Sequence, residues 1–283
     1  MKSIRTKVIA GSAAITTIFI LLLGIISSVL SYQSTFSEAE RSMASMAEIA
    51  SQRVTQEIKS YINVAEAFGG RPDITDPDVP VSEKEDMLTS WADKYGMVRG
   101  NLLDANGNSL FDGNNYADRD YFQQCMAGNT YVSTPVMSKV TDELTIIVAA
   151  PLWEDGNVDT TPVGVVYFVP QETFLNDIMS SIHVSDNGGA YMIDKDGNTI
   201  ADTTMDTVTT QNIENEAETD NSLRALAEIH AKMRSGESGT GNYTSGGESK
   251  MMAYAPVEGT DGWSIGVTAP QSDFMDSTYR SII

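Results

Sequence analysis

The stretch that decides the fold reads Leu102-Leu103-Asp104-Ala105-Asn106-Gly107-Asn108-Ser109-Leu110-Phe111-Asp112. A second copy reads Met192-Ile193-Asp194-Lys195-Asp196-Gly197-Asn198-Thr199-Ile200-Ala201-Asp202. In both copies an apolar run enters a turn of Asp, Asn and Gly, and a second apolar run leaves it, which is typical of a β-hairpin. The sequence therefore predicts one supersecondary unit that is used twice.

Two further landmarks follow each copy in the same order. The first is Ala150-Pro151-Leu152 after one copy and Ala255-Pro256-Val257 after the other. The second is Val169-Pro170-Gln171-Glu172-Thr173-Phe174, matched by Ala269-Pro270-Gln271-Ser272-Asp273-Phe274. Short β-branched runs between these landmarks favour central strands. We therefore expect an α+β fold in which a long N-terminal helix is followed by two tandem antiparallel sheets.

The N-terminus has the pattern of a membrane anchor. Residues 8–30 carry no charge, and they follow Lys2, Arg5 and Lys7. A bilayer core needs about 20 apolar residues in a helix. The positive flank predicts a cytoplasmic N-terminus, with the bulk of the chain extracellular or periplasmic. A cleaved signal peptide is the alternative, and it would need a shorter apolar region with a small-residue cleavage site.

The rest of the chain divides by composition and periodicity. Apolar residues recur at helical spacing from Ser34 to about Gly69, in a stripe wider than one sheet should cover, so we expect two chains to pair along this helix as a homodimer. The expected organisation is a cytoplasmic tip and transmembrane helix (1–33), a long stalk helix (34–70), a first sheet subdomain with its connecting helix (71–184), a second sheet subdomain (185–270), and a helix leading toward a second transmembrane segment beyond the chain (271–283).

Composition disfavours several classes of function. The net charge of −21 lacks the basic face that nucleic-acid binding requires. Cys125 is the single cysteine, so no intrachain disulfide is expected. His183 and His230 lack metal-ligand spacing, and no phosphate-binding loop or nucleophile motif is present in the sequence. We therefore expect no metal, no cofactor and no enzymatic activity.

One passage resembles a known family. It comprises Asp118-Arg119-Asp120-Tyr121-Phe122, then Gly128-Asn129-Thr130-Tyr131-Val132-Ser133-Thr134-Pro135-Val136, then Ala149-Ala150-Pro151-Leu152 and Gly164-Val165-Val166. This run resembles the double Cache domain of bacterial chemotaxis receptors and related transmembrane sensors. The resemblance implies two PAS-like sheet domains, of which the membrane-distal one binds a small molecule and the membrane-proximal one leads back to the membrane.

The resemblance also implies a ligand site. Part of the family binds amino acids through Arg-x-Trp and a later Asp. Arg119 matches the arginine, and Tyr121 stands where the motif has Trp. The motif's acidic residue would fall near Val169, where no charge is found, and its earlier tyrosine would be Asn114, with Tyr116 nearby. The half of the motif that holds an anion is therefore present, and the half that holds an ammonium is absent.

The chemistry of these residues favours an anionic or neutral ligand. Arginine pairs bidentately with a carboxylate, whereas an ammonium without an acidic partner would be left unpaired. We expect a small carboxylate or a polar, nucleobase-like heterocycle. The alternative for Arg119 is a surface ion pair with a neighbouring Asp, and for the aromatic residues a place in the core. The further candidate residues are Ser133 and Tyr131 on one strand, Lys139 on the next loop, Phe122, and Trp91 on the preceding helix.

These expectations converge on a membrane-located sensor. The expected protein is the extracellular small-molecule sensing module of a transmembrane receptor, with a chemotaxis receptor as the first choice. The alternatives are the sensor region of a histidine kinase or diguanylate cyclase, or an exported solute-binding or adhesion protein that does not signal.

Overall fold

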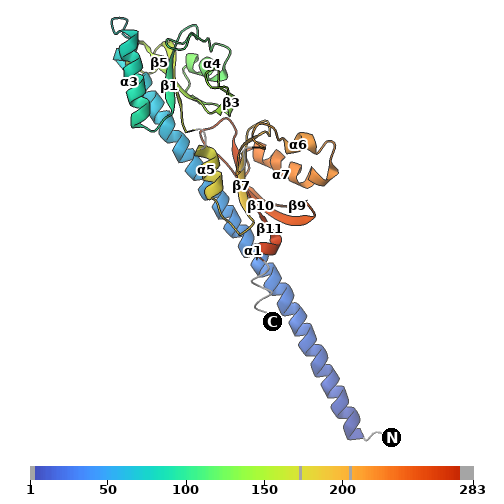
Figure 1. Cartoon of the computed structure of the whole chain (residues 1–283). Coiled ribbons are helices and arrows are strands. Elements are labelled where there is room, and N and C mark those ends of the chain that lie inside the picture. Colours follow the sequence, from blue (N-terminus) through green and yellow to red (C-terminus); the bar gives the residue numbers. More distant parts are fainter. Residues whose placement is uncertain (1–3, 172–173, 204–205, 275–283) are drawn as a thin grey trace.

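One long helix, α1 (Ile4–Gly69), is the central structural element of the molecule. The computed structural model describes residues 4–171, 174–203 and 206–274. With 66 residues at 1.5 Å rise, α1 is about 99 Å long. Figure 1 shows its C-terminal half lying against both sheets and its N-terminal half projecting beyond them. That projecting half contains a window long and apolar enough to cross a membrane, none of which is buried in the protein.

The first sheet is antiparallel, with the strand order β1-β6-β5-β2. Its strands are β1 (Arg99–Asp104), β6 (Pro162–Val169), β5 (Val148–Trp153) and β2 (Tyr131–Val132). α1 and α3 (Val81–Lys94) cover one face of this sheet, and α4 (Asp120–Met126) covers the other. A separate hairpin of β3 (Val136–Met137) and β4 (Leu144–Thr145) stands beside α4.

The continuously apolar sequence of the central strand β6 is explained by packing on both faces of the sheet. Phe168 packs edge-to-face on Phe68 of α1, with ring centroids 5.6 Å apart. Its neighbour Tyr167 points to the opposite face and packs on Tyr121 of α4, also at 5.6 Å. Because successive side chains of a strand alternate between faces and both faces are covered, every position from Gly164 to Val169 is buried and no polar–apolar alternation appears there.

The second sheet repeats the first. Its order, β8-β7-β11-β10-β9, places β7, β11, β10 and β9 where the first sheet has β1, β6, β5 and β2. The prediction of two tandem antiparallel sheets after a long helix is therefore confirmed. The strands are β7 (Gly189–Ile193), β8 (Thr199–Asp202), β9 (Gly239–Ser245), β10 (Glu248–Pro256) and β11 (Ser264–Pro270), with α6 (Ile213–Glu216) and α7 (Arg224–Arg234) on the outer side.

The two predicted turns are held by the same network of hydrogen bonds. Oδ1 of Asp104 accepts from the backbone amides two and four residues further on, at 2.8 and 2.9 Å, and Oδ2 accepts from Nδ2 of Asn108. Asp194 makes the same three bonds in the second copy, where Asn198 is the side-chain donor. In the second copy the chain returns as strand β8, whereas in the first it returns through isolated bridges only.

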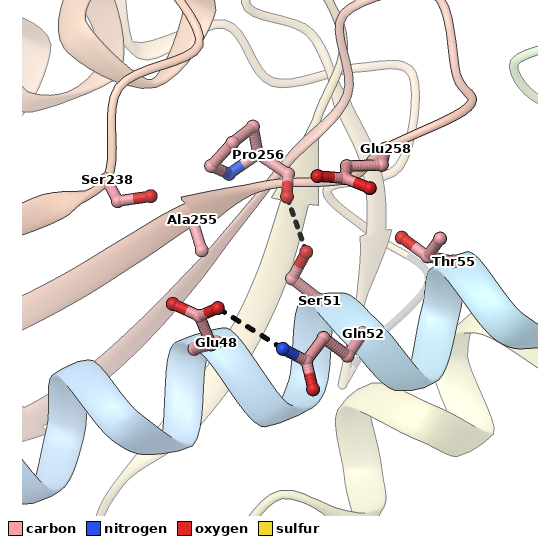
Figure 2. A pocket seen from close by; sticks show the side chains of 8 residues that line it. All are labelled: Glu48, Ser51, Gln52, Thr55, Ser238, Ala255, Pro256 and Glu258. Atoms are coloured by element: carbon pink, nitrogen blue, oxygen red, sulfur yellow. Dashed lines mark hydrogen bonds between the residues drawn. The ribbon is translucent and has the colours of Figure 1, made fainter.

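The Ala-Pro landmarks are the points where each sheet docks on α1. A Cβ atom on Gly69 would overlap the carbonyl oxygen of Pro151, so the first sheet approaches α1 as closely as only glycine allows. In the second sheet, Ser51 Oγ donates a hydrogen bond to the carbonyl oxygen of Pro256 (Figure 2). Gly69 and Ser51 lie 18 residues apart, about five helical turns, and therefore on one face of α1.

This docking changes the interpretation of the apolar stripe on α1. The stripe is wide because one helix packs against two sheets of the same chain, from Ala39 and Met43 at the second sheet to Phe68 at the first. Between residues 34 and 69 the exposed face is polar, and Ile49 is its exposed large hydrophobic residue, at 57%. The stripe therefore does not itself indicate pairing of two chains.

The remaining elements connect these layers. Residues 271–274 are helical, and residues 275–283 lie outside the described residues, so the expected helix over 271–283 stays a prediction. The other elements are α2 (Pro72–Thr75) and α5 (Phe174–Ser181), with short 3-10 turns at Glu154–Gly156 and Asn221–Leu223.

Candidate functional site

A narrow pocket lies between the first sheet, α4 and the β3–β4 hairpin. Its cavity volume is ≈ 10 Å³, which is room for about one water molecule. Three of its side chains are cationic, and no described residue of its lining is an Asp or Glu. The lining residues are Arg99, Tyr116, Arg119, Tyr121, Val136, Met137, Ser138, Lys139, Thr145, Ile147 and Tyr167.

Arg119 and Tyr121 enter the pocket from the start of α4. Arg119 is the N-cap residue, and its extended backbone conformation directs the chain into the helix without a side-chain cap. Its Nη2 donates a hydrogen bond to the carbonyl oxygen of Met137 on β3, at 3.2 Å. Tyr121 is buried, and burial raises the pKa of its hydroxyl, so this group acts as a neutral hydrogen-bonding partner.

Tyr116 and Tyr167 are fixed by one carboxylate behind the pocket. Tyr116 donates a hydrogen bond to Oδ2 of Asp112 at 2.7 Å, and Asn101 Nδ2 links the same oxygen to the Tyr167 hydroxyl at 2.8 and 3.1 Å. Burial and the Asp112 hydrogen bond raise the pKa of Tyr116. Burial alone would raise the pKa of Asp112, but hydrogen bonds from Tyr116 and its neighbours lower it below the ordinary value. Asp112 therefore stays charged and orients the two rings.

Lys139 joins the hairpin to the body of the first sheet. Its Nζ donates to Oδ1 of Asp118 at 2.8 Å and to the carbonyl oxygen of Asn115 at 2.9 Å. The ammonium also lies 5.3 Å from the centroid of the Tyr116 ring. The hydrogen bond from Lys139 lowers the pKa of Asp118, so the Asp118 carboxylate stays charged.

Arg99 is a pocket residue that the sequence analysis missed. It lies at the start of β1, and its Nη2 donates to Oγ of Ser138 on the hairpin, at 3.0 Å. Its Nε is buried and has no hydrogen-bond partner among the described residues. Oγ1 of Thr145, on strand β4 of the hairpin, is likewise buried and unpartnered within the described part of the chain. Two polar atoms of this pocket are thus left available.

Four of the predicted site residues lie outside the lining of this pocket. Ser133 is bound to Ile147 through both its Oγ and its backbone amide, so it supports the pocket wall from behind. Phe122 packs in the core on the α4 side of the sheet. Trp91 packs edge-to-face on Phe68 and donates from Nε1 to the carbonyl oxygen of Val64, so it belongs to the contact between α3 and α1.

Tyr131 faces the second half of the molecule. Burial raises the pKa of its hydroxyl, and the charge of Asp261, from the loop before β11, adds to the shift. Four predicted residues are therefore brought together in the pocket, namely Arg119, Tyr121, Tyr116 and Lys139.

Other pocket residues missed by the sequence analysis come from strands and the hairpin. Tyr167 interrupts an otherwise apolar strand with a hydroxyl, and that was the one available signal. Arg99, Ser138 and Thr145 carry no local signal, because only the tertiary fold brings the start of β1 next to the hairpin.

The corresponding face of the second sheet is filled by side chains. Gly266 takes the place of Tyr167 in the strand register, and Met233 of α7 and Met252 of β10 pack over it. His230 of α7 lies against Tyr191 of β7, with Nε2 and the hydroxyl oxygen 2.5 Å apart. The second half thus has an apolar cluster and an internal polar pair at the position of the first-sheet pocket.

A second hollow, of ≈ 200 Å³, lies where α1 meets the second sheet (Figure 2). Its charged groups are the carboxylates of Glu48 and Glu258. Glu48 already accepts a hydrogen bond from Gln52, and the Ser51 hydroxyl is used by Pro256. These polar groups are therefore used within α1 and in its contact with the second sheet. The first-sheet pocket is the stronger candidate for ligand binding.

Comparison with known proteins supports the fold described above. A model of the Cache domain family matches residues 31–278. The ligand-binding domain of the *Pseudomonas fluorescens* chemoreceptor CtaA in complex with L-leucine is similar in fold, with a TM-score of 0.67 at 16% identity, over 86% of this chain and 99% of that chain. No curated protein sequence matches this chain significantly.

Two further structures have the same fold. The sensory domain of the *Campylobacter jejuni* chemoreceptor Tlp3 with isoleucine bound gives a TM-score of 0.63 at 10% identity, over 87% of this chain and 98% of that chain. The extracellular domain of mmHK1S-Z2, which is described as a histidine kinase, gives 0.63 at 14% identity, over 87% and 99% of the two chains.

Proposed function

This chain belongs to the Cache domain family, and on that premise we propose that it is the extracellular small-molecule sensing module of a transmembrane signal-transduction receptor. The observation that carries the proposal is the first-sheet pocket, where three cationic side chains converge on a lining that has no described carboxylate. The apolar half of α1 supplies a candidate membrane anchor for the module.

The pocket favours an anionic or neutral ligand over an amino acid. The similar structures of CtaA and Tlp3 hold L-leucine and isoleucine. An α-ammonium needs a carboxylate partner, and an unpaired buried charge is costly. In this pocket the described acidic groups nearest the site, Asp112 and Asp118, already bind Tyr116 and Lys139. A small carboxylate, or a heterocycle with a uracil-like edge, avoids that cost.

The β3–β4 hairpin supports a mechanism for sensing. It forms its own two-stranded sheet, and it is tied to the pocket through Arg99–Ser138, Arg119–Met137 and Lys139–Asp118. A ligand larger than one water molecule requires the hairpin to move outward. Binding then biases the receptor if the two hairpin positions differ in affinity for the ligand.

The signal has a direct path to the membrane. The first sheet contacts α1 at Gly69, and the same helix continues past Ser51 at the second sheet into its apolar half. A change at the first sheet therefore acts on one continuous helix whose N-terminal half enters the proposed membrane. Pairing of two chains along α1 stays a prediction.

The proposal has three candidates for the class of protein. Chemoreceptors are the first choice, and a histidine kinase sensor is the second, since both occur among similar structures. A non-signalling exported binding protein is the third candidate. The native gene can be expressed in cells that carry a reporter of kinase activity. The candidates are then separated by whether, and how, the reporter signal depends on the ligand.

A thermal-shift experiment tests the sensing function. The full chain in nonionic detergent is unfolded in the presence of propionate, succinate, uracil or L-leucine, and followed through its tryptophan fluorescence. We expect a carboxylate or uracil to raise Tm, because a ligand that binds the folded state stabilises it. The Arg119→Gln variant should lose this shift, whereas Arg53→Gln on α1 should keep it. Stabilisation by L-leucine alone would contradict the proposed ligand class.

A further inference from the structure

We infer that the first-sheet pocket binds a short dicarboxylate, with Arg119 holding one carboxylate and Arg99 with Thr145 holding the other. This inference rests on the proposed sensing function and names the ligand class of that same site.

The first argument is the charge of the pocket. The chain carries 39 acidic against 18 basic residues, so carboxylates outnumber cations. Among the described residues, the ion pairs within 4.0 Å use Arg71, Arg224 and Arg234, but neither Arg99 nor Arg119. Two guanidinium groups without a carboxylate therefore face one small pocket, and a dianion matches their charge.

The second argument is the pair of unpartnered atoms. Arg99 Nε and Thr145 Oγ1 are both buried, and neither has a hydrogen-bond partner within the described part of the molecule. Thr145 is 2% exposed, so water does not readily satisfy its hydroxyl. An unsatisfied buried polar group costs about 1–3 kcal/mol. A carboxylate at this corner accepts from both atoms, because an arginine fork and a hydroxyl suit its two oxygens.

The third argument is the spacing of the two arginines. Arg119 binds the carbonyl oxygen of Met137, and Arg99 binds the side chain of Ser138, which is the next residue. The two guanidiniums thus reach the hairpin at adjacent positions from different elements. A short ligand with an acid at each end fits this arrangement, and a long one does not.

The tyrosines complete the specificity. Tyr116, Tyr121 and Tyr167 line the space between the two corners, and their rings pack edge-to-face at 5.6–5.8 Å. Raised hydroxyl pKa values keep all three neutral. Tyr121 and Tyr167 can donate hydrogen bonds to carboxylate oxygens or bind a hydroxyl on the ligand chain, whereas the Tyr116 proton is held by Asp112. None of the three adds negative charge.

Calorimetric titration of the full chain in nonionic detergent tests the inference. The probes are malonate, succinate and glutarate, each paired with its half-amide, which has the same length and one carboxylate fewer. We expect the best dicarboxylate to bind about tenfold tighter than its half-amide, since one charge-assisted contact is lost. In Arg99→Gln this preference should disappear, while the half-amide binds as it does to the wild type.

Two variants guard against misfolding and nonspecific charge effects. Thr145→Val keeps the shape of the hairpin and should weaken the dicarboxylate several-fold without affecting the half-amide. Arg53→Gln, on α1 and far from the pocket, should change neither affinity.

The outcomes separate this inference from the proposed function. Equal affinities for the dicarboxylate and its half-amide in the wild type overturn the dicarboxylate assignment and leave carboxylate sensing intact. The same holds if Arg99→Gln and Thr145→Val both keep the preference. Binding of uracil alone, as measured in the thermal-shift experiment, overturns the dicarboxylate assignment and leaves the heterocycle form of the proposed function intact. Binding of no carboxylate and no heterocycle overturns the proposed function as well.

Discussion

The Asp112 carboxylate and the Tyr116 hydroxyl form a 2.7 Å hydrogen bond directly behind the candidate ligand pocket. The same Oδ2 accepts from Asn101, which also donates to the Tyr167 hydroxyl. One carboxylate outside the pocket lining thus fixes two aromatic rings inside it. The network positions the tyrosines, and it occupies the carboxylate oxygens that could otherwise accept hydrogen bonds from an ammonium.

Replacement of Asp112 should weaken ligand binding without removing a lining residue. Asp112→Ala leaves the Tyr116 hydroxyl and the Asn101 amide without their acceptor, at a cost of about 1–3 kcal/mol. We expect a lower Tm and a several-fold weaker carboxylate affinity, measured by calorimetry on the full chain. Asp86→Ala, on the exposed side of α3, is the matched control and should change neither. Tighter binding in Asp112→Ala would show that the carboxylate opposes the ligand.

The close approach of α1 to the first sheet gives a second prediction. Gly69→Ala places a methyl group against the backbone carbonyl of Pro151, which cannot rotate away. Overpacking of this kind costs about 1–3 kcal/mol, so Gly69→Ala should lower the free energy of unfolding. In Gly70→Ala the added Cβ lies 3.6 Å from its nearest neighbours, an ordinary contact, and this variant should be nearly neutral. Equal stabilities of the two variants would contradict the observed docking.

The two equivalent turns, at Asp104 and Asp194, give a third prediction. Asp194→Ala removes three accepted hydrogen bonds in a residue that is 7% exposed, and we expect a loss of about 2 kcal/mol. Asp104→Ala removes the equivalent bonds at a more exposed site and should cost less. Hydrogen exchange followed by mass spectrometry should localise each loss to its own sheet. Asp196→Ala, an exposed neighbour in the same loop, is the control.

The sequence predicted the supersecondary unit that is used twice, because the signals for turns are local. Asp, Asn and Gly at fixed positions specify a turn through bonds that span at most four residues, so the pattern is visible without the fold. The place of Arg119 in the pocket lining was also predictable, because a short motif contains it. Domain boundaries and the homodimer stay predictions.

The rest of the site depends on contacts between distant segments. Arg99 and Ser138 lie 39 residues apart, and nothing near either one indicates their hydrogen bond. Tyr131 and Trp91 were assigned to the pocket because a strand or helix buried on more than one side gives no signal for which side faces a ligand. The apolar stripe of α1 was attributed to a second chain for a related reason, since periodicity shows that a face is buried and not what buries it.

The buried histidine of the second half gives the last prediction, a dependence of stability on pH. Burial lowers the pKa of His230 to about 4, with the charge of Glu214 opposing the shift, while an unfolded histidine has a pKa of about 6.5. The contribution to stability is therefore fully present above pH 6.5 and is lost as the pH falls toward 4, because the unfolded state takes up the proton first.

Between pH 7 and pH 5 the free energy of unfolding should fall by about 2 kcal/mol from this residue alone. His230→Gln should flatten the profile in that interval, where ordinary carboxylates remain ionised. His183→Gln, which replaces the exposed second histidine of the chain, should leave the slope unchanged. Thermal unfolding of the three proteins at pH 7, 6 and 5 measures the effect. A slope that persists in His230→Gln would show that a group other than this histidine takes up the proton on unfolding.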